Sequence, residues 1–223
     1  ALTMTAFDTP GNGLSARWEG RGEVQAVTTQ IAASFLEAPT DIIGHSFGAT
    51  VALRLAVERP ELARSLVLIE PVFFAAALRD FPDTGALHTA ETAEFVAATK
   101  AGDNRATARA FTSLWGDGTP WQEIPEDQKR ALADQMYLIE AGRAALYEDV
   151  GGMLKPGVLD RIDMPVLLIE GSASPAIISA INTSLAARLP LAARAVIVGA
   201  GHMAPITHAS SVAAEILRFL QRT

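Results

Sequence analysis

A serine between two glycines is the feature of this sequence that most directly suggests chemistry. Ser46 lies in the motif at residues 44–48 (GHSFG), between the apolar residues 41–43 and a helix-like stretch at 49–58. Glycine has no Cβ, so the glycines at both ends of the motif allow a strand end and a helix start to approach closely. Such a turn exposes the serine Oγ and directs free helical N–H groups, that of Phe47 first, toward a developing oxyanion. The motif predicts a nucleophilic serine rather than a serine that only caps a helix.

A nucleophilic serine needs a base, because its hydroxyl is a poor nucleophile until its proton is taken. His202 lies on a glycine-rich loop that follows a predicted strand at residues 195–198. A lone histidine is more often structural, but one on such a loop is placed for chemistry rather than packing. We therefore predict that His202 is the base. His88 and His208 keep the structural interpretation, and His45 is expected to shape the turn rather than to act as base.

The elements that must position these side chains alternate between strand and helix patterns. Short apolar runs bounded by turn formers predict strands, and apolar residues three or four apart predict helices. The predicted strands are residues 3–7, 41–43, 65–69, 165–171 and 195–198, and the predicted helices are at about 24–35, 49–58, 175–189 and 210–220. Alternation of this kind, in a chain with enough apolar residues for one sizeable core, predicts the α/β fold class.

The middle of the chain has a different sequence pattern from the two ends. Residues 72–156 form helical stretches rich in alanine and broken by proline and glycine, with no convincing strand. We expect a helical cap, or lid, inserted into a core made of residues 1–71 and 157–223. Periodicity does not separate side chains that line a pocket from those that fill a core. The candidates for lining are Phe73, Phe74, Trp115, Trp121, Met136 and Tyr137.

Composition limits the chemistry and the partners. The net charge is −7 and no cluster of Lys and Arg stands out, which argues against nucleic acid or an anionic membrane as a partner. The absence of cysteine excludes disulfides, thiolate catalysis and cysteine-ligated metals, and it fits a reducing cytoplasm. The first residues show no basic region followed by an apolar core, and no apolar stretch approaches the roughly 18 residues of a membrane span. We expect a soluble cytoplasmic protein without an export signal.

Taken together, these features resemble the α/β-hydrolase superfamily, in its cap-bearing, esterase-like branch. The resemblance covers nearly the whole chain. It rests on the turn at residues 8–15 (DTPGNGLS), the serine motif, the strand ending in Glu70, the helical insertion, and the His202 loop before a final helix. It implies the α/β-hydrolase fold with a mostly parallel, doubly wound sheet, and a serine, acid and histidine triad in that chain order. It also implies a small-molecule substrate and no cofactor or metal.

The acid is where this sequence departs from the commoner family pattern. In many relatives an aspartate stands three residues after the glycine that ends the next-to-last strand, but here Ser174 follows Gly171 at that distance. Some relatives, haloalkane dehalogenases among them, carry the acid at the end of the strand after the elbow helix, where this chain has Glu70. We predict that Glu70 fixes the His202 tautomer and stabilises its positive charge, rather than capping a strand or pairing with an arginine. Weaker substitutes are Glu170, Asp160 and Asp163.

A second departure lies at the N-terminus. In the family, further strands and a His-Gly loop that supplies an oxyanion donor precede the turn at residues 8–15, yet here the turn begins at the eighth residue. The absent strand normally lies between the strands predicted at 3–7 and 41–43. A central gap there would cost roughly 1–3 kcal/mol for each buried orphan N–H or C=O. We expect that the N-terminal strands are missing from this sequence, or that the chain rearranges or borrows one.

The activity implied by the resemblance is hydrolysis of a small ester or related acyl compound. Ser46 would attack the carbonyl, His202 would transfer the proton, Glu70 would orient His202, and the Phe47 N–H would be one oxyanion donor. A carbon–carbon bond hydrolase or a cofactor-free perhydrolase uses the same triad and stays open. Dehalogenase and epoxide hydrolase chemistry is disfavoured, because those relatives use a carboxylate nucleophile. A non-catalytic domain that binds a small ligand is the alternative of a different class.

Overall fold

The computed structural model describes residues 3–223 and confirms the α/β fold class. Within these residues, parallel strands form one sheet in the order β1-β2-β3-β4. The strands are β1 (Thr40–His45), β2 (Ala63–Ile69), β3 (Val166–Gly171) and β4 (Ala192–Ile197). Each lies where the sequence predicts a strand, with its ends shifted by three residues or fewer. The parallel register brings the carboxyl ends of β1, β2 and β3 to one edge of the sheet.

The helices of the core also follow the predicted pattern, except for a short helix at residues 204–207 that the sequence does not predict. They are α1 (Val24–Ser34), α2 (Phe47–Glu58), α8 (Ala176–Ala186), the short α9 (Ala204–Thr207) and α10 (Ala209–Leu220). Glu23 caps the start of α1, because its carboxylate accepts hydrogen bonds from the N–H groups of Gln25 and Ala26. Helix α1 packs against α2, so the N-terminal part of the chain is held to the core through a helix.

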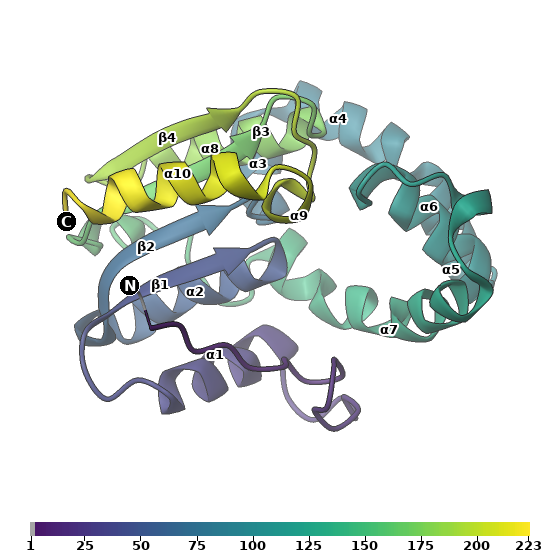
Figure 1. Cartoon of the computed structure of the whole chain (residues 1–223), viewed down its shortest axis with the longest axis horizontal. Coiled ribbons are helices and arrows are strands. Elements are labelled where there is room, and N and C mark those ends of the chain that lie inside the picture. The colour runs from purple at the N-terminus through teal and green to yellow at the C-terminus, as the bar shows by residue number, and fades with distance from the viewer. Residues whose placement is uncertain (1–2) are drawn as a thin grey trace.

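Both faces of the sheet are covered by helices. Leu66 and Leu68 of β2 belong to a cluster shared with α2 and α8, whereas Val67 and Ile69 belong to a second cluster that α10 covers. Successive side chains of a strand point to opposite faces, so a strand between two helical layers is apolar at every position. Figure 1 shows α10 in front of the sheet and α2 and α8 on its other side. This double cover explains why the run in β2 is continuous rather than alternating.

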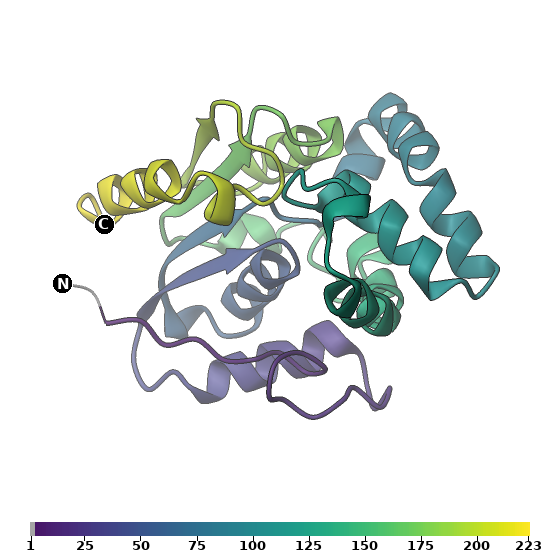
Figure 2. The same ribbon diagram turned by 45° about the vertical axis from the view of Figure 1, so that its right-hand side comes forward.

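The strand predicted at residues 3–7 is wrong. These residues are extended but join no sheet, and β1 is therefore an edge strand, with Ile43 45% exposed. A strand exists only if a neighbouring strand accepts its hydrogen bonds, and local sequence does not supply that neighbour. The segment instead runs beside α1 (Figure 2). Phe7 stacks on Phe35, which follows the last residue of α1, with ring centroids 5.2 Å apart. Because the segment is not part of the sheet, the described sheet has no central gap beside β1.

Residues 72–156 hold helices and, in this described stretch, no strand. The helices are α3 (Phe74–Asp80), α4 (Pro82–Glu91), α5 (Ala93–Lys100), α6 (Asn104–Trp115) and α7 (Glu126–Glu148). Helix α3 is tied to α8, where Ser184 donates a hydrogen bond to Asp80 at 2.7 Å. The arrowheads of the strands in Figure 1 point toward α4–α7, so these helices lie beyond the carboxyl edge of the sheet. No helix among residues 3–223 combines the length and the apolar content needed to cross a membrane.

Candidate active site

Ser46 occupies the turn between β1 and α2 in a strained backbone conformation. Its φ is 55° and its ψ is −120°, a region that side chains with a Cβ rarely adopt. The Ser46 N–H donates to the carbonyl of Ile69 at 2.9 Å, which ties the turn to the end of β2. Strain of this kind persists only where the surroundings fix it, and it is concentrated at functional sites. Phe47 begins α2, so its N–H belongs to the first turn, where the helix supplies no acceptor.

The two glycines of the motif differ in what they contribute. A Cβ on Gly44 would meet the carbonyl oxygen of Gly48 and would lie 2.6 Å from the nitrogen of Ala49. A Cβ on Gly48 would meet nothing within 4 Å. The expectation that the glycines at both ends of the motif allow this close approach is therefore wrong for Gly48. Only Gly44 faces the point where the strand end and the helix start touch.

The structure brings Ser46, His202 and Glu70 into one hydrogen-bonded chain. His202 Nε2 lies 2.9 Å from Ser46 Oγ, and His202 Nδ1 lies 3.1 Å from Glu70 Oε2. Glu70 is fully buried and His202 is 5% exposed. Because the carboxylate accepts at Nδ1, the proton of a neutral His202 lies on Nδ1 and the lone pair of Nε2 faces the serine hydroxyl. This is the order of groups that activates a serine.

The other acids considered for this role lie elsewhere. Glu170 forms a two-bond pair with Arg194, both bonds at 3.0 Å, and accepts a bond from Asn182 at 2.7 Å. Among residues 3–223, neither Glu170 nor the substitutes Asp160 and Asp163 form a hydrogen bond or ion pair with His202.

Glu70 is held by the loop that follows β3. Its Oε1 accepts a hydrogen bond from the Gly171 N–H at 2.5 Å and another from Ser174 Oγ at 2.7 Å, which leaves Oε2 for His202. Glu70 also has a positive φ of 51°. A buried carboxylate is costly unless its oxygens are hydrogen-bonded, and these contacts satisfy both. Ser174, where the family pattern places an acid, thus contacts the acid supplied by another strand. The sequence pointed to this position but not to the contact.

His45 contacts the backbone of the predicted base. Its Nε2 lies 2.8 Å from the carbonyl oxygen of His202, and because a carbonyl only accepts, Nε2 carries the proton. Burial lowers the pKa of His45, although the bond to the His202 carbonyl opposes this shift. A neutral His45 therefore fixes the loop on which His202 lies. Its place next to Ser46 is compatible with the prediction that it does not act as base.

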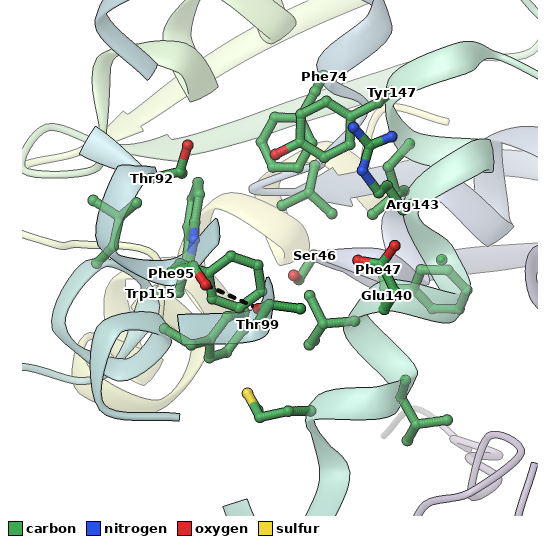
Figure 3. A pocket seen from close by; sticks show the side chains of 18 of the residues that line it. Ser46, Phe47, Phe74, Thr92, Phe95, Thr99, Trp115, Glu140, Arg143 and Tyr147 are labelled. Carbon is green, nitrogen blue, oxygen red and sulfur yellow. Dashed lines mark hydrogen bonds between the residues drawn. The ribbon is translucent and has the colours of Figure 1, made fainter. Parts of the chain in front are cut away.

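A cavity of about 1180 Å³ opens beside Ser46 and His202, between the core and α4–α7 (Figure 3). Its wall is mostly apolar. Of the proposed lining residues, Phe74, Trp115 and Met136 contact the cavity, whereas Phe73, Trp121 and Tyr137 do not. The sequence missed the contributions of Phe47, Phe95, Phe111 and Tyr147. Within residues 3–223, no group of three or more His, Asp and Glu side chains is arranged to hold a metal ion.

Comparisons with known proteins place the chain in a family. The model of a family described as "Alpha/beta hydrolase family" matches residues 2–215. The chain belongs to the alpha/beta hydrolase family. Among its relatives, a pimeloyl-[acyl-carrier protein] methyl ester esterase of Neisseria meningitidis serogroup B (strain MC58) is 30% identical over 98% of this chain and 82% of that protein. A protein of the same name from serogroup A (strain Z2491) is 28% identical over 98% of this chain and 68% of its own length.

Solved structures share the fold of this alpha/beta hydrolase. A thermophilic esterase is 20% identical with a TM-score of 0.63, over 96% of this chain and 79% of that one. A putative lipase from Acinetobacter baumannii AYE is also 20% identical, with a TM-score of 0.68, over 96% of this chain and 73% of that one. At 20% identity the similarity shows the fold alone. The serine motif and the helices inserted after β2 are consistent with that fold.

Proposed function

We propose that this alpha/beta hydrolase is a serine hydrolase that cleaves small carboxylic esters through an acyl-enzyme intermediate. The observation that carries the proposal is the hydrogen-bonded chain from Ser46 through His202 to Glu70, at 2.9 and 3.1 Å. It begins at a strained serine beside an apolar cavity and ends at a buried carboxylate. A residue that served only for packing would need neither the strain nor the paired base.

In the first half of the reaction, Ser46 Oγ attacks the carbonyl carbon of the ester and its proton passes to His202 Nε2. Glu70 stabilises the imidazolium through Nδ1 without taking the proton. The oxyanion accepts a hydrogen bond from the Phe47 N–H at the positive end of α2. The tetrahedral intermediate then expels the alkoxide, which leaves as the alcohol after it receives the proton from Nε2.

In the second half, a water molecule attacks the acyl carbon and gives its proton to Nε2. The second tetrahedral intermediate expels Ser46 Oγ, which recovers its proton from Nε2, and the carboxylic acid product departs. The sum of the two halves is ester plus water to acid plus alcohol, with the protein unchanged.

Family membership and the esterase names of the relatives support a hydrolase of esterase type. The apolar wall of the cavity suits an apolar acyl or alcohol group. We also propose that residues 72–156 form the cap of this enzyme, with α3 as its anchor on α8 and α4–α7 as the part that covers the cavity. Such a cover excludes water from the reacting groups.

The test is hydrolysis of p-nitrophenyl esters with two to ten acyl carbons, together with labelling by a fluorophosphonate probe. We expect wild-type protein to hydrolyse at least one ester and to take up one label, and Ser46→Ala to lose both. Ser34→Ala removes an exposed serine far from the cavity and is the matched control. An unlabelled wild-type protein that still binds esters would mean that the chain is a ligand-binding domain and not a hydrolase.

A further inference from the structure

Most polar groups of the cavity wall, other than Ser46 and His202, are engaged or lie at the rim. Several hydroxyls donate to a carbonyl four residues earlier in their own helix: Thr28, Thr89, Thr92 and Thr99. The charged side chains that border the cavity are exposed to solvent: Glu91, Lys100, Glu140 and Arg143. A pair formed by His88 of α4 and Tyr147 of α7 is different, because it lies inside an aromatic part of the wall.

Aromatic side chains connect this pair to the predicted base, His202. His88 Nε2 and the Tyr147 hydroxyl oxygen lie 2.9 Å apart, and His88 is 2% exposed. Phe74 packs on both rings, with centroid distances of 4.7 Å to His88 and 4.6 Å to Tyr147. Trp115 packs edge to face with both histidines, with ring centroid distances of 6.2 Å to His88 and 4.9 Å to His202. In Figure 3, Phe74 and Tyr147 lie side by side on the wall above Ser46.

The direction of the hydrogen bond within the pair follows from the other ring nitrogen of His88. Burial lowers the pKa of His88 to about 4 and raises the pKa of Tyr147 to about 12, so both groups are neutral near pH 7. His88 Nδ1 is buried and has no partner among residues 3–223. An orphan N–H is rarer in a protein interior than an unused lone pair. The proton of His88 therefore lies on Nε2, which donates to the Tyr147 oxygen.

This direction leaves the Tyr147 O–H without an acceptor in the described part of the chain, on the wall of a mostly apolar cavity. We propose that the Tyr147 hydroxyl, oriented by His88, donates a hydrogen bond to an oxygen of the substrate remote from the scissile ester bond. The substrate class is an ester with an oxo group in the chain of its acyl or alcohol part. This inference rests on the proposed function, because it adds a second polar contact to the same cavity.

The first measurement compares kcat/KM for matched esters with and without an oxo group. The acyl series is p-nitrophenyl hexanoate with its 4-oxo and 5-oxo analogues, and the alcohol series is pentyl butanoate with its 3-oxopentyl and 4-oxopentyl analogues. We expect wild-type protein to favour at least one oxo ester, and Tyr147→Phe to lower that preference about fivefold, as for one neutral hydrogen bond. Tyr137→Phe makes the same change on the same helix, outside the cavity, and leaves the preference unchanged.

His88 is tested as a positioning residue through its variants. Leucine cannot donate to Tyr147, whereas glutamine offers an N–H near the place of Nε2. We expect His88→Leu to reduce the oxo preference and His88→Gln to retain most of it, while both still hydrolyse plain esters. If plain esters are hydrolysed but no oxo preference responds to Tyr147→Phe, the subsite is wrong and the hydrolase proposal stands.

A binding measurement separates the two proposals if hydrolysis fails. Calorimetric titration of Ser46→Ala with methyl hexanoate and methyl 5-oxohexanoate measures the same preference without turnover, and methyl 4-oxohexanoate covers the neighbouring position. Tighter binding of an oxo ester that disappears in the Ser46→Ala/Tyr147→Phe double variant would support the subsite in a chain that lacks activity. Equal binding of all three esters in both variants, with no oxo preference in turnover, would overturn it.

Discussion

The core and helices α4–α7 meet at the cavity, and their polar side chains are arranged differently. In the core, the side chains of Ser46, His202 and Glu70 are joined to one another, and Ser174 and Gly171 hold the far oxygen of Glu70. In α4–α7, the wall beside the cavity is mostly aromatic and aliphatic, and the Thr89 and Thr99 hydroxyls bond to carbonyls of their own helices. The core therefore fixes the geometry of the proposed reacting groups through a closed hydrogen-bond network. Helices α4–α7, the proposed cap, leave room for the shape of a substrate and for a small number of polar contacts with it.

The largest effect expected on the core side is that of Glu70→Gln. This change keeps the size of the side chain but removes the charge that stabilises a protonated His202. We expect kcat for ester hydrolysis to fall by about 10⁴-fold, while Ser46 stays accessible. Stopped-flow and steady-state kinetics on the preferred p-nitrophenyl ester measure it, with Glu170→Gln as the control carboxylate. A loss of less than tenfold would mean that Glu70 is not the acid of the triad.

The two glycines of the serine motif give a sharp contrast within the core. Gly44→Ala places a Cβ against Gly48 and Ala49, so we expect about 3 kcal/mol lower unfolding free energy and a large loss of activity. Gly48→Ala is the matched control, because its Cβ meets nothing within 4 Å. Urea unfolding followed by circular dichroism measures both. Equal destabilisation by the two variants would contradict the assignment of the close contact to Gly44 alone.

His88 is expected to make the stability of the fold sensitive to acid. Its pKa is about 4 in the folded protein, below the ordinary value of 6.5. Between these values the unfolded chain binds a proton that the folded chain does not, so stability rises with pH through this window and is lost as pH falls. We expect the stability advantage of wild type over His88→Gln to shrink by about 2 kcal/mol between pH 7.5 and pH 5. Urea titrations at both pH values measure it, and a constant advantage would refute it.

Ser174→Ala tests how firmly the core holds its acid. The variant removes one of the two donors to Glu70 Oε1 but leaves the Gly171 N–H in place. We expect kcat to fall about tenfold with KM unchanged, because a less fixed carboxylate orients His202 less well. Ser174→Thr keeps the hydroxyl and is expected to recover most of the rate. If Ser174→Thr does not recover the rate, or if Ser174→Ala changes KM alone, Ser174 has a role other than holding Glu70.

The smallest effect is expected in the cap wall. Phe95→Ala enlarges the cavity on the α5 side, and we expect the preferred acyl chain to lengthen, with changes of about three- to fivefold in kcat/KM per ester. The rate of fluorophosphonate labelling should stay within about twofold of wild type. Leu87→Ala, exposed and outside the cavity, is the control. If Phe95→Ala lowers the labelling rate as strongly as it changes the ester selectivity, the wall of the cavity also affects the reactivity of Ser46. That outcome would contradict the separation of roles between the core and α4–α7.

Several parts of the fold were predictable because local physics decides them. The two central strands, β2 and β3, have continuous apolar runs, since both of their faces are buried. The segment at residues 3–7 looks similar but has no neighbouring strand, and whether a neighbour exists is not a local property. The positions of Ser46 and His202 followed from a strand-to-helix turn and a loop after a strand, two features of local geometry. Glu70 followed from family resemblance, which located a strand end but no contact.

By itself the sequence determined the α/β class, the turn that carries Ser46 and the loop that carries His202, because these depend on periodicity and on residues close together in the chain, whereas Glu70 was proposed from the family resemblance. Only the tertiary structure decided that Ser174 holds Glu70 across 104 positions, that His45 holds the His202 carbonyl, and that His88 orients Tyr147. Each of these contacts joins two elements that are separated in sequence. A hydrogen bond needs two groups within about 3 Å, and folding alone sets that distance.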